Sequence, residues 1–394
     1  MARPYRLFGM VFFIYTAFPE GEKMEFLTEA ISLITWKTVL MWAIGGVLIY
    51  LAIKKDMEPA LLLPIGFGAI LVNIPLSNVI GADGGSTGII EWLFNIGIEA
   101  SEALPILLFI GIGAMIDFEP LILNPKLMIL GAFAQLGIFL TIIAAVLLGF
   151  PLKDAASVGI IGAADGPTSI LVAIKLGSSY VGPITVAAYS YMALVPIIQP
   201  AVIKCVTTKK ERRIRMEYST KKVSKTVKIL FPIAVTVVSG LIAPKSLALI
   251  GFLMFGNLLN ECGVLGTLAD TAKNTLCNLI TLLLGITIAF QMQADKFLSA
   301  ETLMIMALGL FAFVFDTVGG VMCAKVMNLF CKNKINPMVG AAGISAFPMS
   351  ARVVHKMGLK EDNANFLLMH AVGANVSGQI ASAICGGLII GLIV

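Results

Sequence analysis

Apolar residues run in long stretches along most of this chain, without the alternation of a half-buried strand. A helix that crosses the hydrocarbon core of a bilayer needs about 20 mostly apolar residues. Ten stretches reach or approach that length: 34–53, 59–77, 103–117, 127–149, 181–203, 229–244, 246–260, 273–291, 301–324 and 364–393. The pattern predicts an all-α polytopic membrane protein with about ten transmembrane helices.

Two further apolar stretches, near 155–177 and 336–358, are interrupted at the middle by Gly and Pro, in the strings AADGPTSI and SAFPMSAR. Proline removes a backbone donor, and backbone groups freed at membrane depth must be satisfied inside the protein. Both stretches are therefore predicted to be broken helices or re-entrant hairpins rather than continuous lipid-facing helices.

The two interrupted stretches are also similar to each other. At an offset of 181 residues, eight of the twenty positions in 158–177 are identical to those in 339–358, and the same offset pairs Gln135 with Asp316. The chain is thus predicted to contain two membrane repeats, 30–203 and 229–394. Because each repeat would hold five crossings, an odd number, the second should be inverted relative to the first.

Composition and charge refine this topology. Hydrophobic residues make up 58% of the 394 positions, charged residues 13%, and the mean hydropathy is +0.95, which excludes an ordinary soluble chain. The net charge of +5 comes from one loop, because residues 204–228 hold ten basic residues against two acids while the rest is slightly acidic. Such a loop marks the cytoplasmic side. It predicts topology rather than binding to nucleic acid.

With the loop 204–228 on the cytoplasmic side of the cell membrane, the C-terminus is expected outside. The loop could also contact anionic lipid or soluble subunits. The N-terminal residues 1–29 contain a short apolar run, 7–18, after Arg3 and Arg6. We expect an interfacial or re-entrant segment there rather than a cleaved signal, because no small-x-small cleavage site follows. The six cysteines form no CxxC pair and there are two histidines, so neither disulfides nor a zinc site is indicated.

Asp165 is the sharpest chemical feature, a carboxylate among small residues at the first interruption. An ionisable residue at membrane depth is a functional candidate by default. Thr168 and Ser169 add hydroxyl oxygens, and Pro167 frees a carbonyl, so the set suits Na+ or a proton rather than a transition metal. The alternative is that Asp165 caps the following half-helix, and a cap can also be a ligand.

The last predicted helix carries a polar cluster in GANVSGQIASA, with Asn375, Ser377, Gln379 and Ser382. Asn375, Gln379 and Ser382 share one helical face. A polar stripe of this kind either lines an ion path or joins helices, and the neighbouring small residues fit close packing as well.

Three other polar residues lie in apolar stretches. Tyr191 could hold or relay a proton, or could be a hydrogen-bonded packing residue. Asp316 could join the ion path or bond the backbone of a broken helix, and we favour the structural role. His370 is expected to be a hydrogen-bonded packing group.

The string VGIIGAADGPTSI, with IDFEPLILNP and GAFAQLGIF upstream and GANVSGQIASA near the end, resembles the beta subunit of the biotin-dependent sodium-pumping decarboxylases. That family acts on oxaloacetate, methylmalonyl-CoA, glutaconyl-CoA or malonate. The resemblance extends from about residue 35 to the end of the chain, and the GAADGPT segment is its most specific part.

The resemblance implies that this subunit decarboxylates carboxybiotin, couples that step to outward Na+ transport and consumes an external proton. It implies biotin-carrier and carboxyltransferase subunits and a small gamma/delta-type membrane subunit as partners in an oligomeric complex. It assigns Asp165 as the Na+ and proton site and matches Tyr191 to the family's tyrosine. Asn375 and Ser382 match its C-terminal asparagine and serine, and Thr168 and Ser377 complete the expected Na+ ligands.

The chain departs from the family at the site for carboxybiotin. Some members carry an arginine late in the last helix, whereas nothing after Lys360 is basic here. Arg352 and Lys356, on the cytoplasmic side by the predicted topology, are the expected substitutes. The chain has no Met-Lys-Met of a biotinylation site, so biotin is expected on a partner. Without the resemblance, the residues alone favour a rival hypothesis, a sodium symporter or sodium/proton antiporter without decarboxylase activity.

Overall fold

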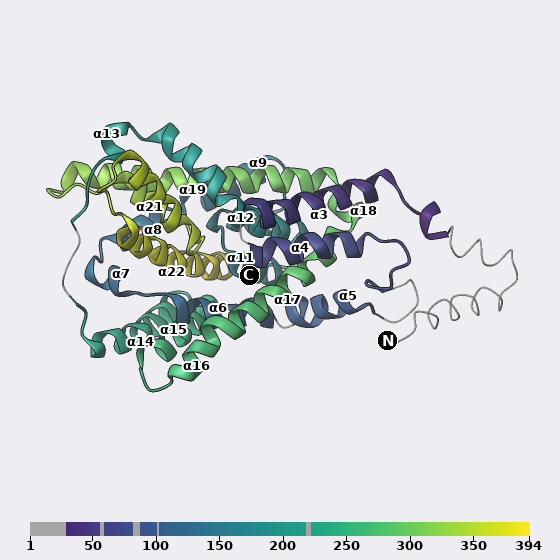
Figure 1. The fold of residues 1–394 in the computed structure, drawn as a ribbon, viewed down its shortest axis with the longest axis horizontal. Helices are drawn as coiled ribbons and strands as arrows, with labels where there is room; N and C mark the ends of the chain where they lie inside the picture. The colour runs from purple at the N-terminus through teal and green to yellow at the C-terminus, as the bar shows by residue number, and fades with distance from the viewer. Residues whose placement is uncertain (1–28, 56–58, 82–86, 101, 218–221) are drawn as a thin grey trace, which may run out of the picture.

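A computed structural model describes residues 29–55, 59–81, 87–100, 102–217 and 222–394 of the protein (Figure 1). Every regular element in these ranges is a helix. Apart from residue 29, the predicted interfacial segment 1–29 lies outside the described residues.

Seven helices in the described ranges are long and apolar enough to cross a membrane, which confirms an all-α polytopic membrane protein. The number is eight if α5 with η1 (Ile89–Phe94, Asn95–Glu99) and α6 (Ala103–Met115), a pair bent by 67°, together count as one broken span. The seven are α3 (Trp36–Lys55), α8 with α9 (Leu127–Phe133, Leu136–Leu147), α12 (Val181–Val206), α14 (Lys225–Ile242), α16 to η5 (Gly266–Met292), α19 (Ala300–Phe330) and α22 (Leu368–Ile393).

The predicted count of about ten spans is not confirmed, although each of the ten stretches contains helix. Three helices are shorter than a span: α4 (Pro59–Val72) has 14 residues, α6 has 13 and α15 (Leu247–Glu261) has 15. Beyond α4 the chain turns, with Leu76 and Asn78 at positive φ. Apolar content predicted these helices, but hydropathy does not register the turns that end them.

Both predicted interruptions are confirmed. The first stretch forms α10 (Leu152–Gly159), the 3-10 turn η2 (Ile160–Ala163) and α11 (Gly166–Lys175). The second forms α20 (Pro337–Ala341) and α21 (Met349–Glu361), separated by an irregular segment. In each case the helix resumes next to the proline, which lacks the backbone donor that an unbroken helix would need.

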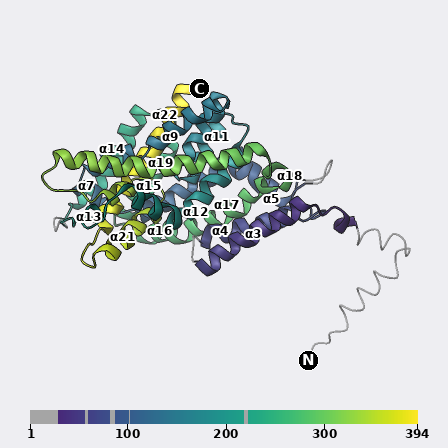
Figure 2. The same ribbon diagram turned by 90° about the horizontal axis from the view of Figure 1, so that it is seen from above.

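The two interruptions are buried in the protein core. The 31-residue α19, roughly 45 Å long at the usual rise, runs along much of the molecule (Figures 1 and 2) and packs on α9, α12 and α20. α22 packs on α8 and α21, and also contacts α11. The largest buried cluster includes residues of both interruptions, among them Ala163, Ala164 and Ile344.

Equivalent hydrogen bonds occur in the two broken stretches. The Ser169 hydroxyl donates to the Ile160 carbonyl at 3.4 Å, and the Ser350 hydroxyl donates to the Ala341 carbonyl at 3.3 Å. Both donors and both acceptors are 181 residues apart. This agreement supports a repeat. The inverted orientation and the division into 30–203, 204–228 and 229–394 stay predictions.

Candidate functional site

The two interruptions meet each other and the last helix. The Ser345 amide donates to the Ala163 carbonyl at 3.1 Å, which joins the second break to the first. From α22, the Asn375 side-chain amide donates to the Ile344 carbonyl at 2.6 Å, and that of Gln379 donates to the Ser345 carbonyl. Free backbone carbonyls of a broken helix are thus satisfied by polar side chains of α22, as burial requires.

Asp165 lies at this junction, at the N-terminus of α11, and is 3% exposed. The Thr168 hydroxyl donates to its Oδ2 at 2.5 Å, and the Ser382 hydroxyl of α22 donates to the same oxygen at 3.4 Å. Three of the predicted Na+ ligands are therefore in direct contact. Asp165 occupies the N-cap position of α11, but its side chain makes no capping hydrogen bond to the backbone there, so its oxygens remain suited to an ion.

Asn375 and Ser377 make different contacts from the other predicted ligands. The Ser377 hydroxyl donates to the Leu127 carbonyl at 2.9 Å and the Ala374 carbonyl at 2.6 Å, which joins α22 to α8. Asn375 donates through nitrogen, whereas its Oδ1 is buried and has no hydrogen-bond partner among the described residues. The same holds for Gln379 Oε1 and Ser345 Oγ. Buried oxygen atoms without a donor are costly, and a bound cation would satisfy them.

The structure separates the two tyrosines of α12. The Tyr191 hydroxyl donates to the Met306 carbonyl in α19, whereas the Tyr189 ring lies against Gly166, where an added Cβ would be 2.2 Å from Cζ. The Tyr189 hydroxyl is buried without a partner in the described chain. Residues two apart in a helix face different sides. The sequence therefore predicted a tyrosine of this helix near the break, but it could not show that Tyr189 rather than Tyr191 faces the break.

The structural role favoured for Asp316 is supported by its contacts. Its Oδ1 accepts hydrogen bonds from the amides of Gly137 and, at 3.2 Å, Ile138, at the discontinuity between α8 and α9. Its repeat mate Gln135 donates to the Gly131 carbonyl at 3.2 Å. His370 Nε2 lies 3.1 Å from the Glu217 carbonyl oxygen, as a packing group would.

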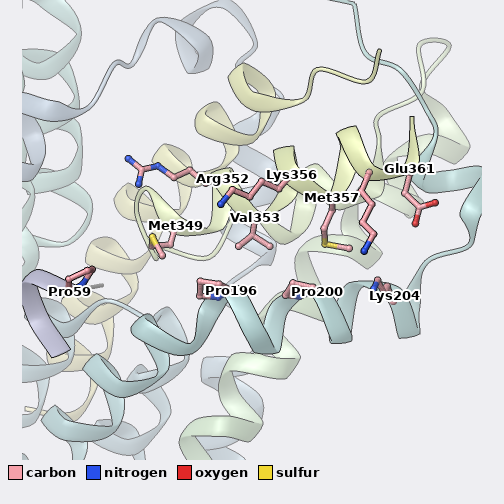
Figure 3. Close-up of a pocket in the computed structure, with 11 residues that line it drawn as sticks. Pro59, Pro196, Pro200, Lys204, Met349, Arg352, Val353, Lys356, Met357 and Glu361 are labelled. Atoms are coloured by element: carbon pink, nitrogen blue, oxygen red, sulfur yellow. The ribbon is translucent and has the colours of Figure 1, made fainter. Parts of the chain in front are cut away.

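A separate pocket of about 530 Å³ lies between the C-terminal part of α12 and α21 (Figure 3). Arg352 and Lys356, the predicted groups for carboxybiotin, both line it. Sequence reasoning missed Lys204 and Lys360, which line it too. A signal was present, because Arg352, Lys356 and Lys360 recur every four residues and so share a helical face. The complete lining is Pro59, Pro196, Pro200, Lys204, Met349, Arg352, Val353, Lys356, Met357, Lys360 and Glu361.

The pocket is connected to the junction through α12 and α21. Met349, which lines the pocket, is the first residue of α21 and directly follows the second break. In α12, Gln199 donates to the Ala341 carbonyl at 2.8 Å and to the Ser350 hydroxyl at 2.7 Å. The pocket is thus linked to the second break by adjacent residues in the chain and by the hydrogen bonds of Gln199. The second break is in turn hydrogen-bonded to the first.

A carboxylate buried where two broken helices meet, among helices of membrane length, is typical of the class of membrane proteins that handle an ion inside the bilayer. Comparison with known proteins identifies the family. Residues 37–393 match the family described as Na+-transporting oxaloacetate decarboxylase beta subunit, and this chain belongs to it. It is accordingly a membrane subunit of a sodium-pumping decarboxylase.

Individual relatives agree over nearly the whole length. The chain is 47% identical to a methylmalonyl-CoA decarboxylase subunit beta of Propionigenium modestum, over 90% of this chain and 94% of the relative. It is 46% identical to a glutaconyl-CoA decarboxylase subunit beta of Acidaminococcus fermentans (91% and 94%) and 42% identical to an oxaloacetate decarboxylase beta chain of Klebsiella pneumoniae (89% and 94%). These matches confirm the resemblance and favour a decarboxylase over the rival transporter without decarboxylase activity.

Proposed function

We propose that this chain decarboxylates carboxybiotin at the basic pocket and couples that reaction to outward Na+ transport through Asp165, with uptake of an external proton. The observation that carries the proposal is the pair of sites described above. One is a cationic pocket at the end of α12, and the other is a carboxylate buried where two broken helices meet, with hydrogen-bonded segments between them.

In the pocket, the proposed substrate is an anion, the N-carboxylate of biotin carried by a partner protein. Lys204, Arg352, Lys356 and Lys360 supply positive charge, and a guanidinium can bind a carboxylate through two parallel hydrogen bonds. Decarboxylation breaks the bond between nitrogen and the carboxylate carbon. CO2 leaves, and a proton takes its place on the nitrogen, so one proton is consumed for each CO2 released.

At the junction, Na+ and a proton would compete for the Asp165 carboxylate. The Thr168 and Ser382 hydroxyls, which now donate to Asp165 Oδ2, can turn their lone pairs toward a cation. Asn375 Oδ1 offers a further oxygen without a partner in the described residues. Ser377 was predicted as a ligand, and its two hydrogen bonds to carbonyls support a packing role instead.

Proton transfer was predicted to involve Tyr191. Its hydroxyl already donates to α19, whereas Tyr189 lies beside Gly166 and its hydroxyl has no partner among the described residues. Tyr191 stays a proposal for that role, and Tyr189 is the phenol whose position supports it better.

The proposed partners are a biotin-carrier subunit, a carboxyltransferase subunit and a small membrane subunit, with biotin on the carrier. Relatives of 42–47% identity are named for three different substrates. That similarity supports a common step in this subunit and a choice of carboxyl donor elsewhere. We also propose that the loop 204–228 and the pocket face the cytoplasm and that the C-terminus is external.

The test is reconstitution of the purified complex in vesicles, with Na+ uptake and CO2 release followed together, with and without avidin. Avidin sequesters biotin, so both signals should stop together when it is added. Na+ uptake that continues in avidin would reject the proposal and restore the rival transporter. An uncoupled vesicle preparation with a Na+ ionophore serves as the control, because CO2 release should continue there without Na+ accumulation.

A further inference from the structure

The basic pocket contains an acidic residue of its own. Glu361, the last residue of α21, lines it together with Lys204, Arg352, Lys356 and Lys360 (Figure 3). A carboxylate free to turn toward these cations would compete for them with an incoming carboxylate, because both are acceptor-only anions of the same geometry. The position of the Glu361 side chain therefore bears on whether the pocket can bind its substrate.

Glu361 is held by an arginine from the basic loop, outside the pocket lining. Arg212 Nε lies 2.8 Å from Glu361 Oε1, and the two side chains are 8% and 17% exposed. Arg213 Nε also donates to the Glu361 carbonyl at 3.2 Å, which holds the end of α21. The Arg212 hydrogen bond lowers the pKa of Glu361 below its ordinary value, so this carboxyl is charged at neutral pH.

Arg212 is itself fixed in place. Its Nη1 donates to the Thr207 carbonyl at 2.7 Å. Its own carbonyl accepts from the side-chain amides of Asn336 at 2.9 Å and Asn365 at 3.0 Å. Thr208 and Glu211 close a capping box at the start of α13 (Lys209–Arg212). These contacts fix the backbone of Arg212, and Thr207 and Glu361 fix its largely buried guanidinium, so it keeps its partner in one orientation, unlike an ordinary surface ion pair.

We propose that Arg212 is a positioning residue that keeps the Glu361 carboxylate away from the pocket cations, so that those cations stay available to the substrate carboxylate. The inference rests on the proposed function, because it takes the pocket as the binding site for carboxybiotin. It assigns part of the loop 204–228 a role in substrate binding in addition to its role in topology. Loss of Arg212 releases Glu361 as an internal competitor.

The test measures initial rates of decarboxylation by the purified complex against the concentration of carboxylated carrier, at saturating Na+ and neutral pH. Arg212→Gln should raise KM about tenfold with a smaller change in kcat. Glu361→Gln should lower KM, because it removes a negative charge from the lining of a pocket that binds an anion. The double variant should recover the KM of Glu361→Gln. A purely structural role for Arg212 predicts the opposite, namely a double variant at least as impaired as Arg212→Gln.

Two further variants keep the test decisive. Lys210→Gln, which removes an exposed charge from the same loop, should leave KM unchanged. If Arg212→Gln does not assemble, Arg212→Lys replaces it, and its raised KM should again be corrected by Glu361→Gln. An Arg212 variant with unchanged KM, or one not corrected by Glu361→Gln, overturns the inference. Failure of the proposed function is distinct, since Arg352→Gln and Lys356→Gln would then leave KM for the carrier unchanged.

Discussion

At the scale of single residues, the central feature is a carboxylate without a cationic partner. Asp165 is buried, and the described hydrogen bonds to its side chain come from the hydroxyls of Thr168 and Ser382. An isolated carboxylate is expensive to bury. Binding a proton or Na+ removes that penalty, and either can be exchanged for the other. The environment therefore suits a site that alternates between two cations better than one that holds a permanent ion pair.

Thr168 should set the affinity of this site for Na+. Thr168→Val keeps the side-chain shape and removes the hydroxyl oxygen, so that a bound Na+ would lose one of its proposed oxygen ligands. We expect the Na+ concentration for half-maximal decarboxylation to rise at least about tenfold, measured as rate against Na+ in the purified complex. Thr168→Ser retains the hydroxyl and should stay close to wild type. Equal behaviour of the two variants would remove the hydroxyl from the site.

Sequence predicted several residues of this site and missed others for physical reasons. Asp165, Thr168 and Ser382 could be named, because an acid beside Gly-Pro and a polar stripe in an apolar helix have few structural explanations. Tyr189 was missed because the choice between it and Tyr191 depends on the rotation of α12. Lys204 was assigned to topology only, since its approach to α21 depends on tertiary packing.

At the scale of elements, the site depends on how closely α22 approaches the second break. A Cβ added at Gly378 would lie 2.0 Å from the Gly343 carbonyl oxygen, so two backbones are in contact there. This contact is what lets Asn375 and Gln379 reach carbonyls of the break. Small residues at helix contacts in membranes act in the same way.

Gly378→Ala should therefore disrupt the site through packing. The added methyl meets backbone rather than a flexible side chain, and overpacking usually costs about 1–3 kcal/mol, occasionally more. We expect a lower unfolding temperature of the purified complex and loss of Na+-dependent activity. Gly391→Ala, in the same helix, is the matched control and should change neither, because no described residue lies within 4 Å of the added Cβ. Similar unfolding temperatures for both variants would contradict the close approach.

The sequence predicted the positions of helices and breaks well, but it predicted the lengths of the helices less well. Hydropathy located helix in every stretch, and the proline-containing strings AADGPTSI and SAFPMSAR located both breaks. The predicted stretches 103–117 and 246–260 were already shorter than a span, and α6 and α15 match them closely. The helix α4 ends at Val72 although its apolar stretch continues to residue 77, because turns and tertiary contacts stop the helix there. Asn73 illustrates this, since its side chain bonds the Ala69 and Met292 carbonyls just beyond α4.

At the scale of the whole molecule, the basic loop forms ion pairs with other parts of the chain, in addition to the topology predicted from its charge. Its cations pair with acids of several segments: Arg212 with Glu361, Arg215 with Asp362, and Lys228 with Glu119. Glu211 of the same loop pairs with Lys325. The charged residues of this loop thus also tie it to both halves of the chain, to Glu119 in the first and to Lys325, Glu361 and Asp362 in the second.

These pairs should make stability depend on pH in acid. Hydrogen bonds from Arg212 and Arg215 hold the pKa of Glu361 and Asp362 below their ordinary values. A carboxyl whose pKa is lowered by folding contributes its full stabilisation above its pKa in the unfolded state, which is about 4. That stabilisation is lost as pH falls through its lower pKa in the folded state. The unfolding temperature of wild type should therefore fall more steeply below about pH 4 than that of Glu361→Gln/Asp362→Asn.

At pH 7 the double variant should be the less stable of the two proteins, because only wild type then has both ion pairs. Glu301→Gln, an exposed acid at the start of α19, is the control and should follow the wild-type curve. Parallel acid profiles for wild type and the double variant would show that the loop does not contribute stability in this way.

The most direct test of the central claim is Asp165→Asn in reconstituted vesicles, with Na+ uptake and CO2 release recorded in the same sample. Asparagine keeps the size of the side chain but can neither bind a proton in exchange for Na+ nor carry negative charge. We expect a complex that assembles like wild type yet has lost coupled Na+ uptake and the Na+ dependence of decarboxylation. A variant that pumps Na+ with the wild-type dependence on its concentration would contradict the assignment of Asp165 as the coupling site.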